Sequence, residues 1–184
     1  MIRGVTLWAA LFLVVWPMAP QESNLVWEPL RFLFGEWTGE GSGEPGEGSG
    51  SFSFRLELEQ KILMRRNRAE YPARQGRPAF SHEDLMIVYK DTGGGRFRAV
   101  YFDSEGHVIH YGVRVSEDGR MVQFLSEASG QGPRYRLTYT KTGGDTVRLK
   151  FETAPAGKPE SFSTYIEAGA RRSPESGRIK TAPR

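Results

Sequence analysis

Cysteine is absent from this chain of 184 residues, and histidine occurs only three times. The lack of cysteine excludes a disulfide framework, thiolate metal sites and a lipid anchor attached through a cysteine. Long apolar runs are missing after residue 20, and the run from Leu7 to Trp16 is too short to span a bilayer of about 30 Å comfortably. The length is enough for one domain with a hydrophobic core and too short for two ordinary domains.

The first twenty residues have the layout of a secretory signal. They contain one positive charge at Arg3, an apolar run, and then proline and small residues. Ala19 is the expected last residue of the signal, and an uncleaved anchor is the alternative because Pro20 would follow the cut. We therefore expect residues 1–20 to be a signal peptide. The mature barrel is then exported, periplasmic or secreted, without stable insertion into a membrane.

Basic charge is scarce on the body of the chain and concentrated at its C-terminal end. Residues 171–184 hold five arginine or lysine residues against one acid, so the body is mildly acidic although the whole chain carries +3. Binding to nucleic acid needs basic side chains on the folded face that meets phosphate, so we expect no nucleic-acid partner. The composition of residues 171–184 predicts a basic disordered tail, which leaves residues 21–170 as the folded domain.

Helical periodicity is confined to a short segment after the signal. Ser23 or Asn24 is a candidate cap for a helix that carries Leu25, Leu30, Leu33 and Phe34, with Pro29 limiting its length. From Glu36 onward, apolar and polar residues alternate between turns rich in Asp, Gly, Ser and Pro. The alternation predicts ten strands, at residues 37–43, 51–59, 61–71, 82–90, 96–102, 107–115, 120–128, 134–141, 145–153 and 160–168.

Short turns between consecutive strands predict an antiparallel meander. A meander of ten strands removes its exposed edges most simply by closing, so we expect an all-β, ten-stranded up-and-down barrel with a short N-terminal helix. A two-sheet sandwich is the alternative, but it needs long crossovers, and only the 72–81 loop is long enough. In the first strand, Trp37 is expected to cover the base of the core. The alternate residues Gly39, Gly41 and Gly43 form a face without side chains, which lets the strand bend or pack on its backbone.

These residues resemble a known superfamily. Gly35-x-Trp37-x-Gly39-x-Gly41-x-Gly43 is similar to the entry motif of the calycins, which include lipocalins, fatty-acid-binding proteins and nitrobindins. The segments "RRNRAEYP", "HEDLMIVYKD" and "GHVIHYGV" are similar to secreted bacterial barrels described as nitrobindin-like, and the resemblance covers about residues 25–170. It implies a cation–π contact between Trp37 and Arg171 or Arg172, near the end of the last strand.

The resemblance also bears on haem. Nitrobindins bind haem through a histidine on the last strand, just before a Thr-Tyr pair, whereas this chain has Phe162 and Ser163 in that run. We therefore expect no cofactor. Haem held by Tyr165 is the alternative.

Histidines and acids provide the candidate polar site. A metal site needs ligands that converge on one point, and His107 and His110 point to opposite faces of one strand, so we expect no metal. His82 and His110 are the two histidines that can share a lumen face. In "HED", His82 and Asp84 lie on one face and are candidates for a general base, but no nucleophile signature accompanies them. An enzyme is therefore not the favoured interpretation.

Arginines on the third strand provide the candidate anchor for a ligand. Arg66 and Arg68 share one face, and Arg65 and Asn67 share the other, so at least one cation faces the lumen. A buried arginine needs either the acids of "HED" or an anionic ligand as its partner.

We expect an exported barrel that binds an apolar or amphiphilic small molecule with an anionic group. The alternatives are a haem-binding or histidine-dependent catalytic barrel and a filled structural barrel, and the oligomeric state stays open. The candidate ligand-binding residues are Arg66, Arg68, His82, Asp84, Tyr101 and His110, and the candidate structural residues are Trp37, Gly39, Gly41, Arg171 and Arg172. The aromatic residues expected to point inward are Phe52, Phe54, Phe97, Tyr101, Phe124, Tyr135, Tyr139, Phe151 and Phe162.

Overall fold

The computed structural model describes residues 23–40, 48–74, 76, 78–93, 95–128 and 132–174. The predicted signal peptide, Gly41 and most of the predicted tail lie outside these residues. No helix in the described part of the chain is both long enough and apolar enough to cross a membrane.

The fold is an all-β closed barrel, as the alternation of the sequence predicted. Ten antiparallel strands pair in chain order, and β1 closes the ring by pairing with β10, with Trp37 opposite Arg172. Because the ladder is continuous around the ring, the two-sheet sandwich is wrong. The strands are β1 (Gly35–Glu40), β2 (Ser49–Glu57), β3 (Ile62–Tyr71), β4 (Phe80–Lys90), β5 (Phe97–Asp103), β6 (Val108–Val115), β7 (Met121–Ser126), β8 (Arg134–Lys141), β9 (Thr146–Ala154) and β10 (Ser163–Arg172).

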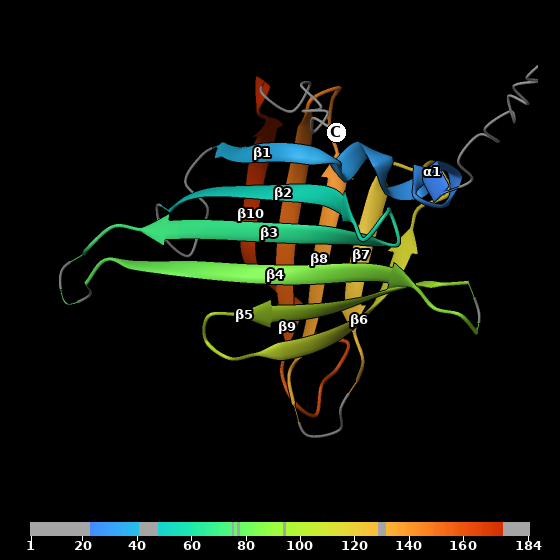
Figure 1. Ribbon diagram of the computed structural model, residues 1–184. Helices are drawn as coiled ribbons and strands as arrows, with labels where there is room; N and C mark the ends of the chain where they lie inside the picture. The colour runs from blue at the N-terminus through green and yellow to red at the C-terminus, as the bar shows by residue number, and fades with distance from the viewer. Residues whose placement is uncertain are drawn as a thin grey trace, which may run out of the picture.

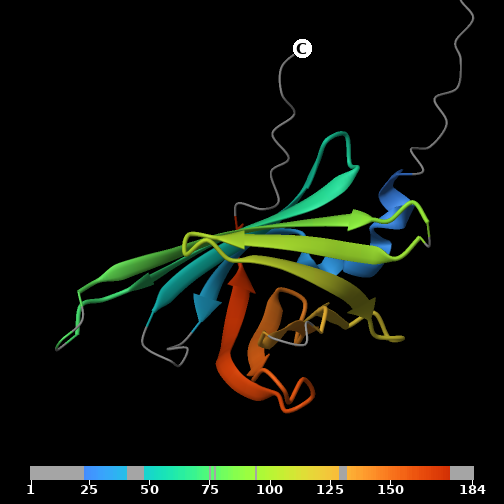
Figure 2. The same ribbon diagram turned by 90° about the horizontal axis from the view of Figure 1, so that it is seen from below.

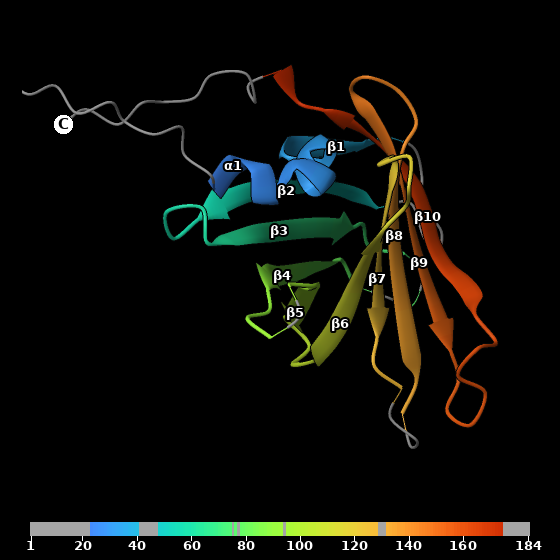
Figure 3. The same ribbon diagram turned by 90° about the vertical axis from the view of Figure 1, so that its right-hand side faces the viewer.

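The barrel is flattened into two crossing layers. Strands β1 to β5 run side by side in one layer, and β7 to β10 cross behind them in the other (Figure 1). Figure 3 shows β6 turning from the first layer toward the second, and Figure 2 shows the same arrangement from below.

One end of the barrel is plugged by the segment before β1. The sequence predicted a single short helix here, and the structure has one turn of α-helix, α1 (Ser23–Val26), followed by a 3₁₀ helix, η1 (Glu28–Leu33). Leu30 and Leu33 are completely buried, whereas Leu25 is 76% exposed and does not belong to the core. The indole of Trp27 stacks on Phe97 with ring centroids 5.4 Å apart, which ties the plug to β5.

Aromatic rings run through the lumen from this plugged end. Phe54 meets Tyr139 edge to face at 5.5 Å, Tyr139 meets Phe124 at 6.3 Å, and Phe124 meets Tyr111 at 6.3 Å. Edge-to-face contacts of this kind contribute about 0.5–1.5 kcal/mol each beyond the burial of area. Eight of the nine aromatic residues that the sequence placed inward belong to this core or pack against it, and Phe162 is the exception.

Trp37 sits at the base of the core, as predicted, and Arg172 covers it. The guanidinium carbon of Arg172 lies 4.3 Å from the ring centroid of Trp37, and the Trp37 indole nitrogen donates to the carbonyl of Leu33 at 2.8 Å. Of the two arginines predicted for this role, Arg172 fills it. Arg171 instead pairs with Glu40 on the outer face, with Nε and Oε1 2.6 Å apart.

Gly39 allows β1 and β2 to approach closely. A Cβ atom at Gly39 would lie 3.2 Å from the carbonyl oxygen of Gly50, so a side chain there would force the two strands apart. This agrees with the prediction that the glycine face lets another segment pack on its backbone.

The turn between β2 and β3 is left-handed without any glycine. Leu58, Glu59 and Gln60 have φ angles of 51°, 53° and 66°, a region that L-residues avoid. The indole nitrogen of Trp27 donates to the Gln60 carbonyl at 2.8 Å, so the plug also holds this turn in place.

Candidate functional site

The end of the lumen opposite the plug is open to solvent. On β3, β4 and β8 the lumen-facing residues near the plug are buried, and those two to four positions further along are only partly buried. On β8, for example, Tyr139 is fully buried while Tyr135 is partly exposed. Solvent therefore reaches the lumen-facing side chains at this end, which are Asn67, His82, Tyr101 and Tyr135.

A buried ion pair lies at the base of this open end. Arg65 projects inward from β3 and pairs with Asp84 of β4, and their side chains are only 5% and 4% exposed. Burial lowers the pKa of Arg65, but the charge of Asp84 together with the contributions of Tyr139 and Tyr101 outweighs that effect and raises the pKa overall, so Arg65 stays a cation. Asn67 donates to the second carboxylate oxygen of Asp84 at 2.9 Å.

His82 stands above this pair, nearer to solvent. Its Nε2 lies 3.3 Å from Asp84 Oδ2, and its Nδ1 lies 3.0 Å from Glu105 Oε1. The hydrogen bond to Asp84, supported by Glu105, raises the pKa of His82 to about 9. His82 is therefore an imidazolium at neutral pH, and this protonated form cannot serve as the general base that the "HED" motif suggested.

Tyr101 adds a hydroxyl to the same point. Its oxygen lies 3.3 Å from His82 Nε2, and burial, followed by the nearby Asp84, raises the pKa of Tyr101 so that the phenol stays protonated. We call Arg65, Asn67, His82, Asp84 and Tyr101 the lumen cluster. Both N–H groups of His82 meet carboxylates, so the protonated hydroxyl of Tyr101 is the group of this pair that can donate to an oxygen acceptor.

Three aromatic rings lie on the opposite side of the open end, and we call Tyr135, Phe151 and Tyr165 the aromatic wall. Tyr135 of β8 stacks on Phe151 of β9 with centroids 6.0 Å apart, and Phe151 meets Tyr165 of β10 edge to face at 6.1 Å. The pKa of Tyr71, at the end of β3, is raised chiefly by burial.

Two buried polar atoms of the lumen have no hydrogen-bond partner among the described residues. They are Nε of Arg65 and the hydroxyl of Tyr139, and the Arg65 guanidinium lies 6.0 Å from the Tyr139 ring centroid. Burial raises the pKa of Tyr139 to about 12, so its hydroxyl remains a donor. Leaving a buried polar atom unpaired costs about 1–3 kcal/mol, so these two atoms require an explanation.

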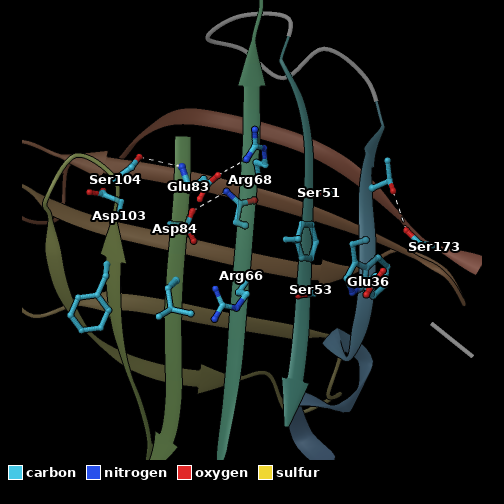
Figure 4. A pocket seen from close by; sticks show the side chains of 16 residues that line it. Glu36, Ser51, Ser53, Arg66, Arg68, Glu83, Asp84, Asp103, Ser104 and Ser173 are labelled. Atoms are coloured by element: carbon cyan, nitrogen blue, oxygen red, sulfur yellow. Dashed lines mark hydrogen bonds and ion pairs between the residues drawn. The ribbon is translucent and has the colours of Figure 1, made fainter. Parts of the chain in front are cut away.

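The sequence predicted Arg66 and Arg68 as lumen residues, and this placement is wrong. Both are exposed on the outer face of β3, while Arg65, on the other face of the strand, points inward. Arg66 and Arg68 instead line a hollow of about 740 Å³ on the outer face of β1 to β5, which we call the outer hollow (Figure 4). Arg68 pairs there with Glu83, with Nη1 and Oε1 2.5 Å apart.

His110 does not join His82. It is exposed on β6 while Ile109 and Tyr111 on either side of it pack toward the core, so the predicted pair of lumen histidines is wrong. His82, Asp84 and Tyr101 are brought together as predicted. Arg65 and Asn67, which the sequence placed on the alternative face, complete the cluster with them.

The residues around the last strand do not fit a haem ligand set. Phe162 lies outside the core against Arg136, whose guanidinium carbon is 4.1 Å from the ring centroid. Both nitrogens of His82, the histidine that faces the lumen, already meet carboxylates. Tyr165 is 54% exposed at a bulge of β10. None of these side chains is positioned as an axial ligand inside the barrel.

One triad in the described part of the chain brings potential metal ligands within 4.8 Å of one another: Asp103, Glu105 and His107. Hydrogen bonds of the β5–β6 turn account for this arrangement. Asp103 accepts from the backbone nitrogens of Glu105 and His107, at 3.1 and 2.9 Å, and lies 2.9 Å from His107 Nδ1.

Comparison with known proteins adds no assignment to this geometry. No family model matches the chain, and neither does any curated protein. The fold therefore defines the class, a closed ten-stranded antiparallel barrel, and the calycin resemblance stays a prediction.

Proposed function

We propose that this protein is an exported, calycin-like barrel that binds an apolar or amphiphilic small molecule at the open end of its lumen. The observation that carries the proposal is the protonated hydroxyl of Tyr101, which lies at the open end of an otherwise buried lumen. This hydroxyl is 3.3 Å from His82 Nε2 and remains a donor for a carbonyl or carboxylate oxygen of a ligand.

The aromatic wall supports an apolar body for the ligand. Tyr135 and Phe151 are partly exposed although they pack against the core, so their rings offer apolar surface at the open end. A polar or anionic group of the ligand is best placed at the Tyr101 hydroxyl, because Arg65 and His82 already have Asp84 and Glu105 as counter-ions.

Native mass spectrometry of the full chain, purified from its own host, tests this proposal. We expect a reproducible mass excess that disappears on denaturation, that is reduced in His82→Gln and Tyr101→Phe, and that is unchanged in the control His110→Gln. His110 is a suitable control because it is exposed on the outer face of the barrel.

The proposal fails if the wild-type chain carries no excess mass and its melting temperature does not respond to a panel of carboxylic acids and haem. A filled structural barrel would then be the better description. A Soret band after addition of haem, retained in His82→Gln, would favour the haem alternative over the proposed site.

A further inference from the structure

The outer hollow contains a cation without a counter-ion. Arg66 is exposed and makes no hydrogen bond or ion pair with the described residues. Its arginine neighbours on β2 and β3 all have acids: Arg55 pairs with Glu36, Arg65 with Asp84, and Arg68 with Glu70 and Glu83. Figure 4 shows Arg66 in the middle of β3 with no interaction drawn to it, two residues along the strand from Arg68, which is paired.

Strand register places Arg66 at the polar end of a straight row. Ser53 lies opposite Arg66, Arg66 opposite Leu85, Leu85 opposite Phe102, and Phe102 opposite Val108. The register continues beyond Ser53 to Glu36, which pairs with Arg55, and we call the five residues from Ser53 to Val108 the outer row. Neighbouring strands are about 4.8 Å apart, so the distance from Arg66 on β3 to Val108 on β6 is about 14 Å along the row.

The other end of the outer row is apolar and exposed. Phe102 is 40% exposed and Val108 is 57% exposed, although both belong to paired strands. The next row on the same face continues this surface with Met64, Ile87 and Val100, which also lie opposite one another. An apolar patch that borders a cation is typical of a binding surface rather than of an ordinary solvated face.

The hollow is open to solvent, and its volume of about 740 Å³ is sufficient for a small molecule. A guanidinium binds a carboxylate through two parallel hydrogen bonds, and the Ser53 hydroxyl, opposite Arg66 in the register, is a further donor.

We propose that the outer hollow is a second binding site, for a monocarboxylate with an apolar body. The carboxylate binds Arg66 and Ser53, and the body lies along Leu85, Phe102 and Val108. The outer row is on the outer face of the barrel, and Asn67 and Asp84 of the lumen cluster also border the hollow.

Titration of the full chain with decanoate, below the concentration at which it forms micelles, tests the site by calorimetry and by amide chemical shifts. We expect shifts at Arg66, Leu85, Phe102 and Val108. Affinity should fall by about tenfold or more in Arg66→Gln, because a charge-assisted hydrogen bond is lost, and should fall severalfold in Val108→Thr. 1-Decanol lacks the carboxylate and acetate lacks the apolar body, so both should bind more weakly than decanoate.

Arg68→Gln is the matched control, since Arg68 is on the same strand and face but has its own acids. It should retain decanoate affinity within about twofold when binding is followed at the Leu85 and Phe102 amides. Equal affinity in Arg66→Gln overturns the proposal, and so do shifts confined to lumen amides such as Tyr101. Binding to anionic lipid vesicles without binding to decanoate also overturns the proposal. So does dimerisation through the outer row, if Val108→Thr abolishes the dimer and decanoate has no effect.

Discussion

The guanidinium of Arg172 lies 4.3 Å from the ring centroid of Trp37, and it joins the last strand to the plug that closes the barrel. Arg172 also donates to the carbonyl oxygens of Phe34 and Phe32, the latter at 3.1 Å, and pairs with Asp145. This side chain therefore adds contacts with the plug to the backbone pairing of β1 with β10.

We predict that Arg172→Ala lowers the free energy of unfolding by about 2–4 kcal/mol, since it removes a cation–π contact and charge-assisted hydrogen bonds. Arg171→Ala is the control and should cost less than about 1 kcal/mol, because its pair with Glu40 is exposed. Urea denaturation of both variants measures the difference. Equal costs would mean that Arg172 is not the residue that closes the plug.

Stability should depend on pH through His82. Its pKa is raised from 6.5 to about 9 by Asp84 and Glu105, so the folded state binds the proton more tightly than the unfolded state. The stabilisation is complete below about pH 6.5 and is lost as pH rises to about 9, with a total of about 1–3 kcal/mol. Thermal or urea unfolding from pH 6 to 9.5 should show this decline, and His82→Gln should lack it while His110→Gln retains it. An unchanged slope in His82→Gln would assign the decline to another group.

Removing one partner of the buried ion pair between Arg65 and Asp84 should lower the free energy of unfolding. Either Arg65→Met or Asp84→Leu leaves an uncompensated charge in the lumen and should cost about 3–5 kcal/mol. Asp84→Leu should be the worse of the two, because Asp84 also binds Asn67 and His82. The double variant should recover part of the loss, and the control Arg66→Met should stay within about 0.5 kcal/mol of the wild type. Strictly additive single costs in the double-mutant cycle would contradict a direct interaction.

The left-handed turn between β2 and β3 should be improved by glycine. Glu59 is exposed with φ 53°, so Glu59→Gly removes the steric cost of that conformation and should raise the free energy of unfolding by up to about 1 kcal/mol. Glu57→Gly, two residues earlier in the extended strand β2, is the matched control and should destabilise by about 0.5–1 kcal/mol. The sign difference between the two variants is the measurement, and destabilisation by both would show that the turn is not strained at residue 59.

The number and order of the strands follow from the sequence alone. Turn residues act within four positions and side-chain alternation acts along one strand, so both signals are local. Nine of the ten predicted strands agree with the structure within three residues at each end, and β10 extends four residues further than predicted, to Arg172. The same alternation correctly placed His82 with Asp84 on one face and separated Arg65 from Arg66.

Only the tertiary structure decided which face of β3 points inward. Leu63 and Met64 are both apolar and arginines occupy both faces, so the phase of the strand is ambiguous in the sequence. Pairing settles it, because Arg65 lies opposite Phe54 on one side and Met86 on the other, and both of these are buried. The charge of Arg65 is tolerated there because the register between β3 and β4 brings Asp84 close to it as a partner.

The position of the lumen cluster at an open end was likewise decided in three dimensions. The plug occupies one end because Leu30, Leu33 and Trp27 have apolar surface to bury, and the opposite end is left to His82 and Tyr101. Glu105 reaches His82 from a turn 23 residues away, a contact that no local pattern encodes. The sequence thus determined the strands and their alternation. Packing between strands distant in the chain determined which of the alternating side chains form a site.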